Sequence, residues 1–147
     1  MTYLLDTNIL LDYLNGVEST VSTANRLFNL ISTSVIVKGE LFHGVYMSAR
    51  IDDNERLVTE LLDTISLISI DENTAVVYAK LKTAIYDRFG PKDRAKRRNF
   101  KIEFLGFKDN DLWIASTAIQ HRLILVSSDS DMMRLHGVAG LRVENWS

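Results

Sequence analysis

Apolar residues alternate between two patterns along the chain. Five short runs rich in leucine, isoleucine and valine are typical of buried strands, and they span Tyr3–Leu5, Ser34–Val37, Leu67–Ile70, Leu123–Val126 and Leu141–Val143. Longer stretches repeat apolar residues at helical spacing, which predicts helices over Asn8–Asn15, Ser19–Ile31, Gly39–Ala49, Asp53–Ile65, Asn73–Arg88 and Asp111–His121. Strands that alternate with helices need crossover connections, so the pattern predicts an α/β fold with a central parallel β-sheet flanked by α-helices.

Carboxylates follow two of the predicted strands. The first strand runs into Asp6, and the fourth runs through Ser127 into Asp129. In open parallel sheets the ligand site forms at the carboxyl ends of the strands, especially where the strand order reverses, so both positions are candidates for a functional site. Each aspartate also suits an ordinary helix N-cap, which accepts a backbone N–H. Placement at a strand end leaves both interpretations open.

Asp111 has an unusual position on a predicted helix. At helical spacing it shares a face with apolar residues, namely Ile114, Ala115, Ala118 and Ile119. A carboxylate on an inward stripe loses water and needs hydrogen bonds, a cation or a proton in compensation. The alternative is a first-turn aspartate that complements the helix dipole.

Glu40 follows the second predicted strand and alone is typical of a surface glutamate at the start of a helix. An α/β topology can bring strand ends and helix starts to one edge of the sheet, where Asp6, Glu40, Asp111 and Asp129 would repel one another. Divalent cations or protons relieve such repulsion, and a ligand set made only of oxygen selects hard ions such as Mg²⁺ or Mn²⁺. The pattern therefore suits metal-dependent hydrolysis of phosphodiesters.

Composition narrows the class of protein. The 147 residues fit one domain, and 46% hydrophobic and 24% charged residues are typical of globular proteins. The absence of cysteine excludes disulfides, thiolate metal ligands and a cysteine nucleophile. His43, His121 and His136 have no metal-ligand spacing. Because Asp6 interrupts the apolar amino-terminal run and no basic segment precedes it, we expect a cytoplasmic location and no membrane association.

Charge is concentrated in one segment. The net charge is −2, yet residues 92–101 carry a local charge of +5, which leaves −7 elsewhere. We call residues 91–109 the basic arm and predict a loop there, after the break at Gly90 and Pro91. The arm is either a solvated loop or a phosphate-binding element beside the acidic residues. The candidate phosphate-binding residues are Lys92, Arg94, Lys96, Arg97, Arg98 and Lys101.

Three phenylalanines lie in the basic arm, at Phe100, Phe104 and Phe107. Aromatic rings stack on unpaired bases, which suits a role in binding single-stranded nucleic acid. They are equally suited to anchoring the arm on the hydrophobic core. The sequence leaves both roles open.

Five segments of the chain resemble the PIN-domain ribonucleases, and specifically the VapC-type toxins of type II toxin–antitoxin modules. They read LLDTNILLDYL at the amino end, SVIVKGEL around Glu40, NDLWIASTA around Asp111, LVSSDSDM around Asp129 and GLRVENW at the carboxyl end. Any one segment is weakly specific, but their order and spacing span nearly the whole chain. The resemblance therefore implies a single PIN-like domain over residues 1–147.

The resemblance assigns roles to particular residues. It implies catalytic and metal-binding roles for four acidic residues, which are Asp6, Glu40, Asp111 and Asp129. It also implies that Asn8 and Ser127 are supporting polar residues. It also implies that the first and fourth strands are neighbours. Asp131 remains an alternative to Asp129.

The resemblance further implies an endoribonuclease that uses Mg²⁺ or Mn²⁺ on an RNA substrate, a cognate VapB-like antitoxin, and a homodimer. Two features depart from the family pattern. Val37 stands where a threonine or serine often precedes the glutamate by three residues, and the basic arm is longer and more basic than the usual linker.

Two other functions remain open at this point. One is a housekeeping PIN nuclease in RNA processing or decay, and the other is a non-catalytic RNA-binding PIN-like module. The four carboxylates disfavour the second, because a pure binder of polyanionic RNA gains nothing from clustered negative charge.

Overall fold

The five strands form one parallel sheet in the order β3-β2-β1-β4-β5 in the computed structural model, which describes residues 1–147. The strands are β1 (Tyr3–Leu5), β2 (Ile31–Ser34), β3 (Ser66–Ile68), β4 (Ile124–Val126) and β5 (Arg142–Glu144). The strand order reverses between β1 and β4, which pair directly and place Leu5 opposite Val126. The predicted α/β class and the predicted pairing of the first and fourth strands are therefore confirmed.

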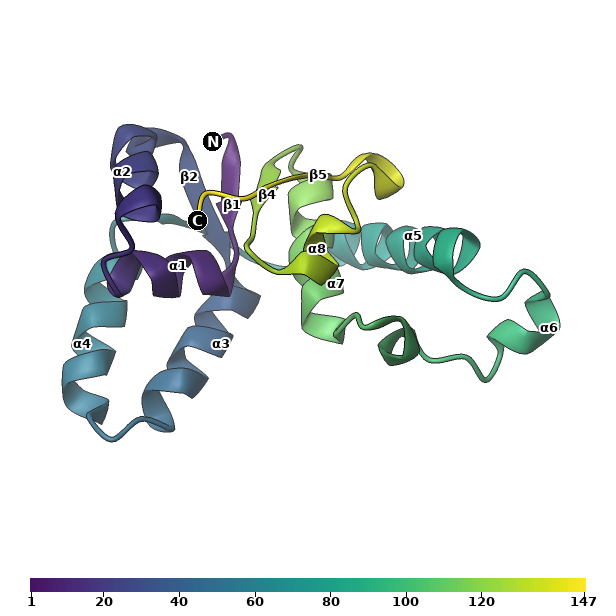
Figure 1. Cartoon of the computed structure of the whole chain (residues 1–147), viewed down its shortest axis with the longest axis horizontal. Coiled ribbons are helices and arrows are strands. Elements are labelled where there is room, and N and C mark those ends of the chain that lie inside the picture. The colour runs from purple at the N-terminus through teal and green to yellow at the C-terminus, as the bar shows by residue number, and fades with distance from the viewer.

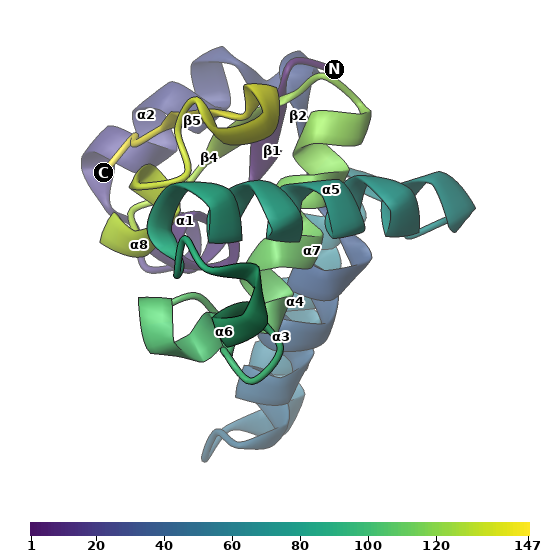
Figure 2. The same cartoon turned by 90° about the vertical axis from the view of Figure 1, so that its right-hand side faces the viewer.

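The helices cover both faces of the sheet (Figures 1 and 2). Helices α1 and α2 lie on one side, and α5 and α7 lie on the other, while α3 and α4 form a hairpin that projects beyond the sheet. The helices are α1 (Thr7–Leu14), α2 (Glu18–Arg26), α3 (Val35–Tyr46), α4 (Ile51–Leu62), α5 (Glu72–Phe89), α6 (Arg94–Arg97), α7 (Asp109–Gln120) and α8 (Ser130–Met133). No helix is both long and apolar enough to cross a membrane.

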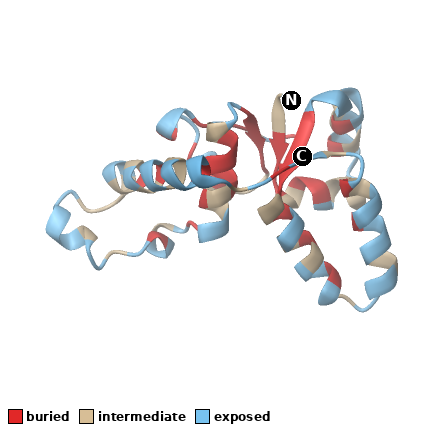
Figure 3. Cartoon of the chain, turned by 180° about the vertical axis from the view of Figure 1, so that it is seen from behind, coloured by how far each residue is buried: buried red, intermediate tan, exposed pale blue.

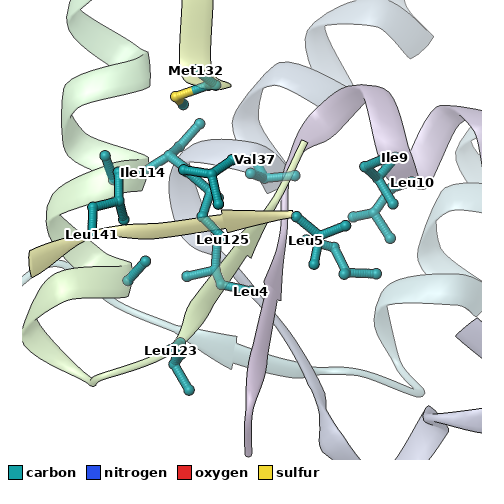
Figure 4. Close-up of a cluster of buried hydrophobic side chains, with 14 of the residues drawn as sticks. Leu4, Leu5, Ile9, Leu10, Val37, Ile114, Leu123, Leu125, Met132 and Leu141 are labelled. Carbon is teal, nitrogen blue, oxygen red and sulfur yellow. The ribbon is translucent and has the colours of Figure 1, made fainter. Parts of the chain in front are cut away.

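One hydrophobic core surrounds the sheet, whereas the α3–α4 hairpin and the far end of the basic arm are largely exposed (Figure 3). Leu4 and Leu125 of neighbouring strands are fully buried. Figure 4 shows Ile114 of α7 on one side of these strands and Ile9 of α1 on the other. The core therefore fixes the strand ends, where the candidate acidic residues begin.

The predicted strand Ser34–Val37 is wrong, because β2 ends at Ser34 and α3 begins at Val35. Ser34 caps α3, since its hydroxyl oxygen accepts a 3.2 Å hydrogen bond from the backbone N–H of Val37. The real strand contains Ser32 and Thr33, both fully buried. Their hydroxyls donate 2.8 Å hydrogen bonds to backbone carbonyls of β1, which removes the cost of burying them. The predicted helix Ser19–Ile31 is also too long, because α2 ends at Arg26 and Ile31 belongs to β2.

The basic arm is more ordered than the predicted loop. It contains the short helix α6 and a turn of 3₁₀-helix over Ile102–Leu105. Ile102 and Phe107 are buried in the core. The segment therefore packs against the domain along part of its length, and its α6 end extends away from the sheet (Figure 1).

Candidate active site

Asp6 is a buried carboxylate at the end of β1, where the strand order reverses. Its Oδ1 accepts a 2.8 Å hydrogen bond from the backbone N–H of Thr7, so it caps α1. Its Oδ2 accepts a 2.8 Å hydrogen bond from the hydroxyl of Ser127, directly after β4. Asp6 thus combines the two roles that the sequence left open, as a helix cap and as a polar group at the strand ends.

The loop after β4 ties the two strand ends together. The Ser127 hydroxyl oxygen accepts a 3.1 Å hydrogen bond from the N–H of Asp129, and Asn8 Oδ1 accepts a 3.3 Å bond from the N–H of Ser128. Asp129 caps α8, since its Oδ1 accepts a 2.8 Å bond from the N–H of Asp131. Asn8 and Ser127 are therefore placed to hold the loop that carries Asp129 against the loop that carries Asp6.

Glu40 reaches the same edge from the second turn of α3. The hydroxyl of Thr7 donates a 3.0 Å hydrogen bond to Glu40 Oε1 and so links α3 to the start of α1. Thr7 was not among the residues predicted from the sequence, although a hydroxyl next to Asp6 in the Asp-Thr-Asn segment was a usable signal. Val37 supplies no hydroxyl and is fully buried. The hydroxyl bond to Glu40 comes from Thr7.

Asp111 lies in the first turn of α7, half-buried above an apolar face. Ile114, Ala115 and Ala118 on that face are fully buried, as the helical spacing predicts. Asp111 Oδ2 accepts a 3.3 Å hydrogen bond from the N–H of Lys108. Burial is the main reason why the pKa of Asp111 rises to about 6, and the negative charges of Asp6 and Asp129 raise it further.

The four carboxylates, which we call the acidic centre, influence one another electrostatically. The pKa of Asp6 is raised mainly by burial and further by the charges of Glu40 and Asp129, against the opposing effect of its hydrogen bonds. The pKa of Glu40 is also raised, mainly by burial and then by Asp111. The positive charge of Lys108 lowers the pKa of both Glu40 and Asp111. Lys108 is thus a second residue of the site that sequence reasoning missed.

Asp131 faces the basic arm and pairs with Arg134, at 3.1 Å between Oδ1 and Nη1. The charges that raise the pKa of Asp6 and Asp111 include Asp129 and not Asp131. This geometry favours Asp129 over Asp131 as the fourth member of the acidic centre.

The six cations selected in the basic arm fall into two groups. Arg97 donates to the Asp87 carboxylate at 2.6 Å and to the Pro91 carbonyl at 2.8 Å, and Lys92 donates to the Asp87 carbonyl at 2.9 Å. These two hold the arm on the end of α5. The other four are exposed and make no ion pair, and they are Arg94, Lys96, Arg98 and Lys101.

The three phenylalanines of the arm also differ. Phe107 is fully buried, and its ring lies 6.0 Å from that of Phe89. Phe100 packs edge-on against Tyr86, at 5.9 Å between ring centroids. Phe104 is 67% exposed. Phe107 and Phe100 are therefore anchors, and Phe104 has a surface available for stacking.

The acidic centre fits a hydrated divalent ion in its ligand chemistry. Its donors are all oxygen, and Glu40, Asp111 and Asp129 each bond one carboxylate oxygen within the chain and leave the other without a protein partner. No three acidic or histidine side chains converge closely enough, as they stand, to enclose an ion together. Mg²⁺ commonly binds through one or two carboxylates and keeps several waters, which suits this open arrangement better than a closed cage would.

Similar proteins point to one family. The PIN domain profile matches residues 3–138. Ribonuclease VapC2 of Rickettsia felis is 27% identical over 149 residues, which cover 99% of this chain and 98% of that protein. A chain in the crystal structure of VapBC2 from Rickettsia felis, bound to a DNA fragment from their promoter, matches with a TM-score of 0.78 and 25% identity over 100% of both chains.

A second solved structure has the same fold. A chain of DNA-bound VapBC from Salmonella typhimurium matches with a TM-score of 0.79 and 19% identity, covering 100% of this chain and 99% of that one. The domain profile spans most of the sequence, and the strand order agrees with the expectation drawn from the motifs. This chain belongs to the PIN-domain family.

Proposed function

We propose that the chain is an endoribonuclease that hydrolyses RNA phosphodiester bonds with Mg²⁺ or Mn²⁺ and acts as the toxin of a toxin–antitoxin pair. The observation that carries this proposal is the gathering of Asp6, Glu40, Asp111 and Asp129 at the switch point of the sheet, with raised carboxyl pKa values in Asp6, Glu40 and Asp111. Relatives named as ribonucleases support RNA as the substrate.

The chemistry divides between the ion and the chain. Asp6, Glu40, Asp111 and Asp129 would hold a divalent ion, which when bound would supply an activated water and charge stabilisation for the leaving oxygen. Ser127 and Thr7 orient Asp6 and Glu40 through their hydroxyl bonds. A carboxylate of the centre that does not bind the ion would accept the proton of the attacking water.

The basic arm provides the substrate-binding part of the proposal. Its four exposed cations attract RNA phosphates, and this attraction is independent of base sequence. The exposed ring of Phe104 supplies a face on which an unpaired base stacks. Together these side chains would bind a single-stranded segment of the RNA.

An apolar groove next to the acidic centre supports an antitoxin partner. It lies between α1, α3 and α4 with a volume of about 290 Å³, and it is lined by Leu11, Leu14 and Leu57, with Thr7 and Glu40 at its margin. An apolar segment that fills the groove and carries a basic residue toward Glu40 would complement both its surface and its charge. We propose an antitoxin of this chemistry as the occupant, which agrees with similar folds solved as VapBC complexes.

We further propose that the protein works in the cytoplasm as a homodimer. Exposed apolar residues at the tip of the α3–α4 hairpin support contact with another chain, since Tyr46 is 57% and Met47 76% exposed. Light scattering on the purified protein measures its oligomeric state. A monomer at every concentration tested would contradict the dimer without affecting the nuclease proposal.

The decisive experiment is RNA cleavage by the purified protein with and without EDTA. Asp6→Asn and Asp111→Asn each remove a charge of the acidic centre while keeping the shape of the side chain, and we expect both to abolish the EDTA-sensitive activity. Asp63→Asn is the matched control, because Asp63 is exposed at the end of α4. Unchanged turnover in the Asp6→Asn/Asp111→Asn double variant would refute the proposed nuclease.

The two other functions give different results in simple assays. A non-catalytic RNA-binding module binds RNA without EDTA-sensitive cleavage. A housekeeping nuclease cleaves RNA, but its expression does not arrest growth and no small upstream reading frame encodes a DNA-binding protein. Growth arrest that the product of such a frame reverses would favour the toxin.

A further inference from the structure

Arg134, directly after α8, joins that helix to the basic arm and to α5. Its Nη1 donates hydrogen bonds to the carbonyl oxygen of Leu105 at 2.5 Å and to Oδ1 of Asp131 at 3.1 Å. The guanidinium group also lies over the ring of Phe107, at 4.6 Å from the centroid, and near the ring of Phe89, at 5.1 Å. One side chain therefore contacts three separate segments of the chain.

The surroundings of Arg134 are closely fitted. Gly106 has φ +91°, a conformation that favours glycine, and a Cβ there would lie 3.3 Å from Asp131 Oδ1 and 3.5 Å from Arg134 Nη1. The next residue, Phe107, is fully buried. The arm thus passes α8 at a defined point, and Arg134 fills the space between them.

Several weak contacts combine at this point. The ion pair with Asp131 is partly exposed, with 38% and 40% of the two side chains accessible, and such a pair alone contributes little. A charge-assisted bond to a backbone carbonyl and two aromatic faces add to it. Because all of them converge on one guanidinium group, removing that group would remove these contacts between α8 and the arm together.

A continuous set of bonds leads from this junction to the acidic centre. Asp129 Oδ1 accepts the N–H of Asp131, and the carboxylate of Asp131 pairs with Arg134. Arg134 in turn donates to the Leu105 carbonyl of the arm. The helix that Asp129 caps is therefore also the support for the arm.

We propose that Arg134 is a positioning residue, which sets the orientation of the basic arm relative to the acidic centre and so aligns bound RNA with the site of cleavage. This inference rests on the proposed function, because it assigns the arm to RNA binding. It also gives Asp131 a role of its own, as the partner that holds Arg134.

The main test is a double-mutant cycle between Arg134 and the arm. The arm-neutralised variant carries Arg94→Gln, Lys96→Gln, Arg98→Gln and Lys101→Gln, and Arg134→Ala is made with and without these changes. We expect Arg134→Ala alone to raise KM for a short single-stranded RNA about three- to tenfold, with a smaller change in kcat. In the arm-neutralised background it should have no further effect on KM, because the arm no longer holds RNA.

Two further variants separate positioning from direct contact. Arg134→Lys keeps the positive charge but not the planar group that spans the rings and the carbonyl, so it should behave like Arg134→Ala. Asp131→Ala leaves Arg134 in place and should raise KM in the same direction by a smaller factor. Arg142→Ala is the charge-matched control, since Arg142 is exposed on β5 and makes no ion pair.

Three outcomes would overturn the proposal. Additive effects of Arg134→Ala and arm neutralisation would make the residue independent of the arm, and full rescue by Arg134→Lys would make it a simple phosphate contact. If Asp131→Ala lowers kcat alone, Asp131 acts as a member of the acidic centre and not as the partner that holds Arg134.

Limited proteolysis tests the junction without RNA. Trypsin cleaves after exposed lysines and arginines, so Arg134→Ala should speed cleavage within residues 92–101 several-fold while Arg142→Ala does not. An unchanged rate would overturn the positioning role even in a folded, active protein. If the wild-type protein cleaves no RNA but Arg134→Ala still loosens the arm, the proposed nuclease fails and the junction stands.

Discussion

The hydroxyl of Ser127 donates a 2.8 Å hydrogen bond to Oδ2 of Asp6, across 121 positions of the sequence. The pairing of β1 with β4 makes this contact possible, since the two residues directly follow those strands. Ser127 also accepts the N–H of Asp129, so one buried hydroxyl lies between two members of the acidic centre. Its bond to Asp6 lowers the pKa of that carboxyl, against the effect of burial.

We predict that Ser127→Ala weakens both catalysis and folding. Asp6 would lose a bond that favours its ionised form, so kcat/KM should fall about 10- to 100-fold, as for partners that orient metal ligands. The free energy of unfolding should fall by about 1–3 kcal/mol, because a buried acceptor loses its donor. Cleavage kinetics at several Mg²⁺ concentrations and urea denaturation measure the two effects.

Ser128→Ala is the control for this variant, because Ser128 contributes only its backbone N–H to the observed bonds. It should retain wild-type kinetics. Equal losses in the two variants would mean that the loop, and not the Ser127 hydroxyl, is the sensitive feature.

We predict that Asp111→Asn stabilises the metal-free protein near neutral pH. The pKa of Asp111 in the folded chain is about 6, above the value of about 3.9 in an unfolded chain. The folded state therefore binds this proton more tightly, and the free energy of unfolding falls as the pH rises from about 4 to about 6. After allowance for the exposed part of the side chain, the asparagine should recover about 1–2 kcal/mol above this window.

The comparison is made by urea denaturation in EDTA on either side of that window. Other acidic groups affect both proteins alike, so the informative quantity is the difference between variant and wild type. It should be small near pH 4 and larger near pH 7.5. Asp63→Asn should show no such difference, and a gain in Asp111→Asn that is independent of pH would contradict the burial of a charged carboxylate.

We predict that Mg²⁺ raises the melting temperature and that this effect weakens as the pH falls. Protons and the cation compete for the same carboxylates, whose pKa values are raised in Asp6, Glu40 and Asp111. At an ion concentration about 100-fold above Kd, binding adds about 2.7 kcal/mol to stability. Differential scanning fluorimetry with and without the ion measures the shift at each pH.

Asp6→Asn should reduce that shift, whereas Asp63→Asn should not. An equal shift in all three proteins would assign the ion to another surface. In that case the acidic centre would balance its charge with protons instead.

The position of the candidate site could be predicted from the sequence because strand ends and a helix face are local features. Asp6 and Asp129 follow apolar runs, and Asp111 shares its helix face with Ile114 and Ala118. Parallel strands bring such residues to one edge whatever the details of the loops. Glu40 needed the family resemblance, because its contact with Thr7 joins residues 33 positions apart.

The parts that the sequence did not predict depend on tertiary partners. Ser32 and Thr33 can be buried in a strand because their hydroxyls donate to backbone carbonyls of β1. The spacing of apolar residues along the sequence gives no sign of these hydrogen bonds. In the sequence Arg97 does not differ from the neighbouring cations, but in the fold it bonds to Asp87 and Pro91. Patterns of charge and hydropathy do not show such pairing. The sequence therefore placed the six candidate cations of the arm in one group, whereas in the fold two of them bond to the end of α5 and four are exposed.

This division of the arm leads to a prediction about salt dependence. Neutralising Arg94, Lys96, Arg98 and Lys101 together should reduce the slope of log affinity against log salt by up to about 3 for single-stranded RNA, at about 0.7 per phosphate contact. Fluorescence anisotropy in the inactive Asp6→Asn background measures this slope. A control set of three changes to glutamine, at Arg26, Arg122 and Arg142, which are exposed and lie outside the arm, should leave the slope unchanged.

Arg97→Gln should behave differently from its neighbours. Its side chain is only 16% exposed and pairs with Asp87, so its charge is already balanced within the protein. The slope of log affinity against log salt should change by less than the value of about 0.7 expected for one phosphate contact. Trypsin should cleave the arm faster, because the arm loses its attachment to α5. If Arg97→Gln lowers the slope as much as a change at Arg94 does, the arm rearranges on binding and the ion pair with Asp87 is exchanged for a phosphate.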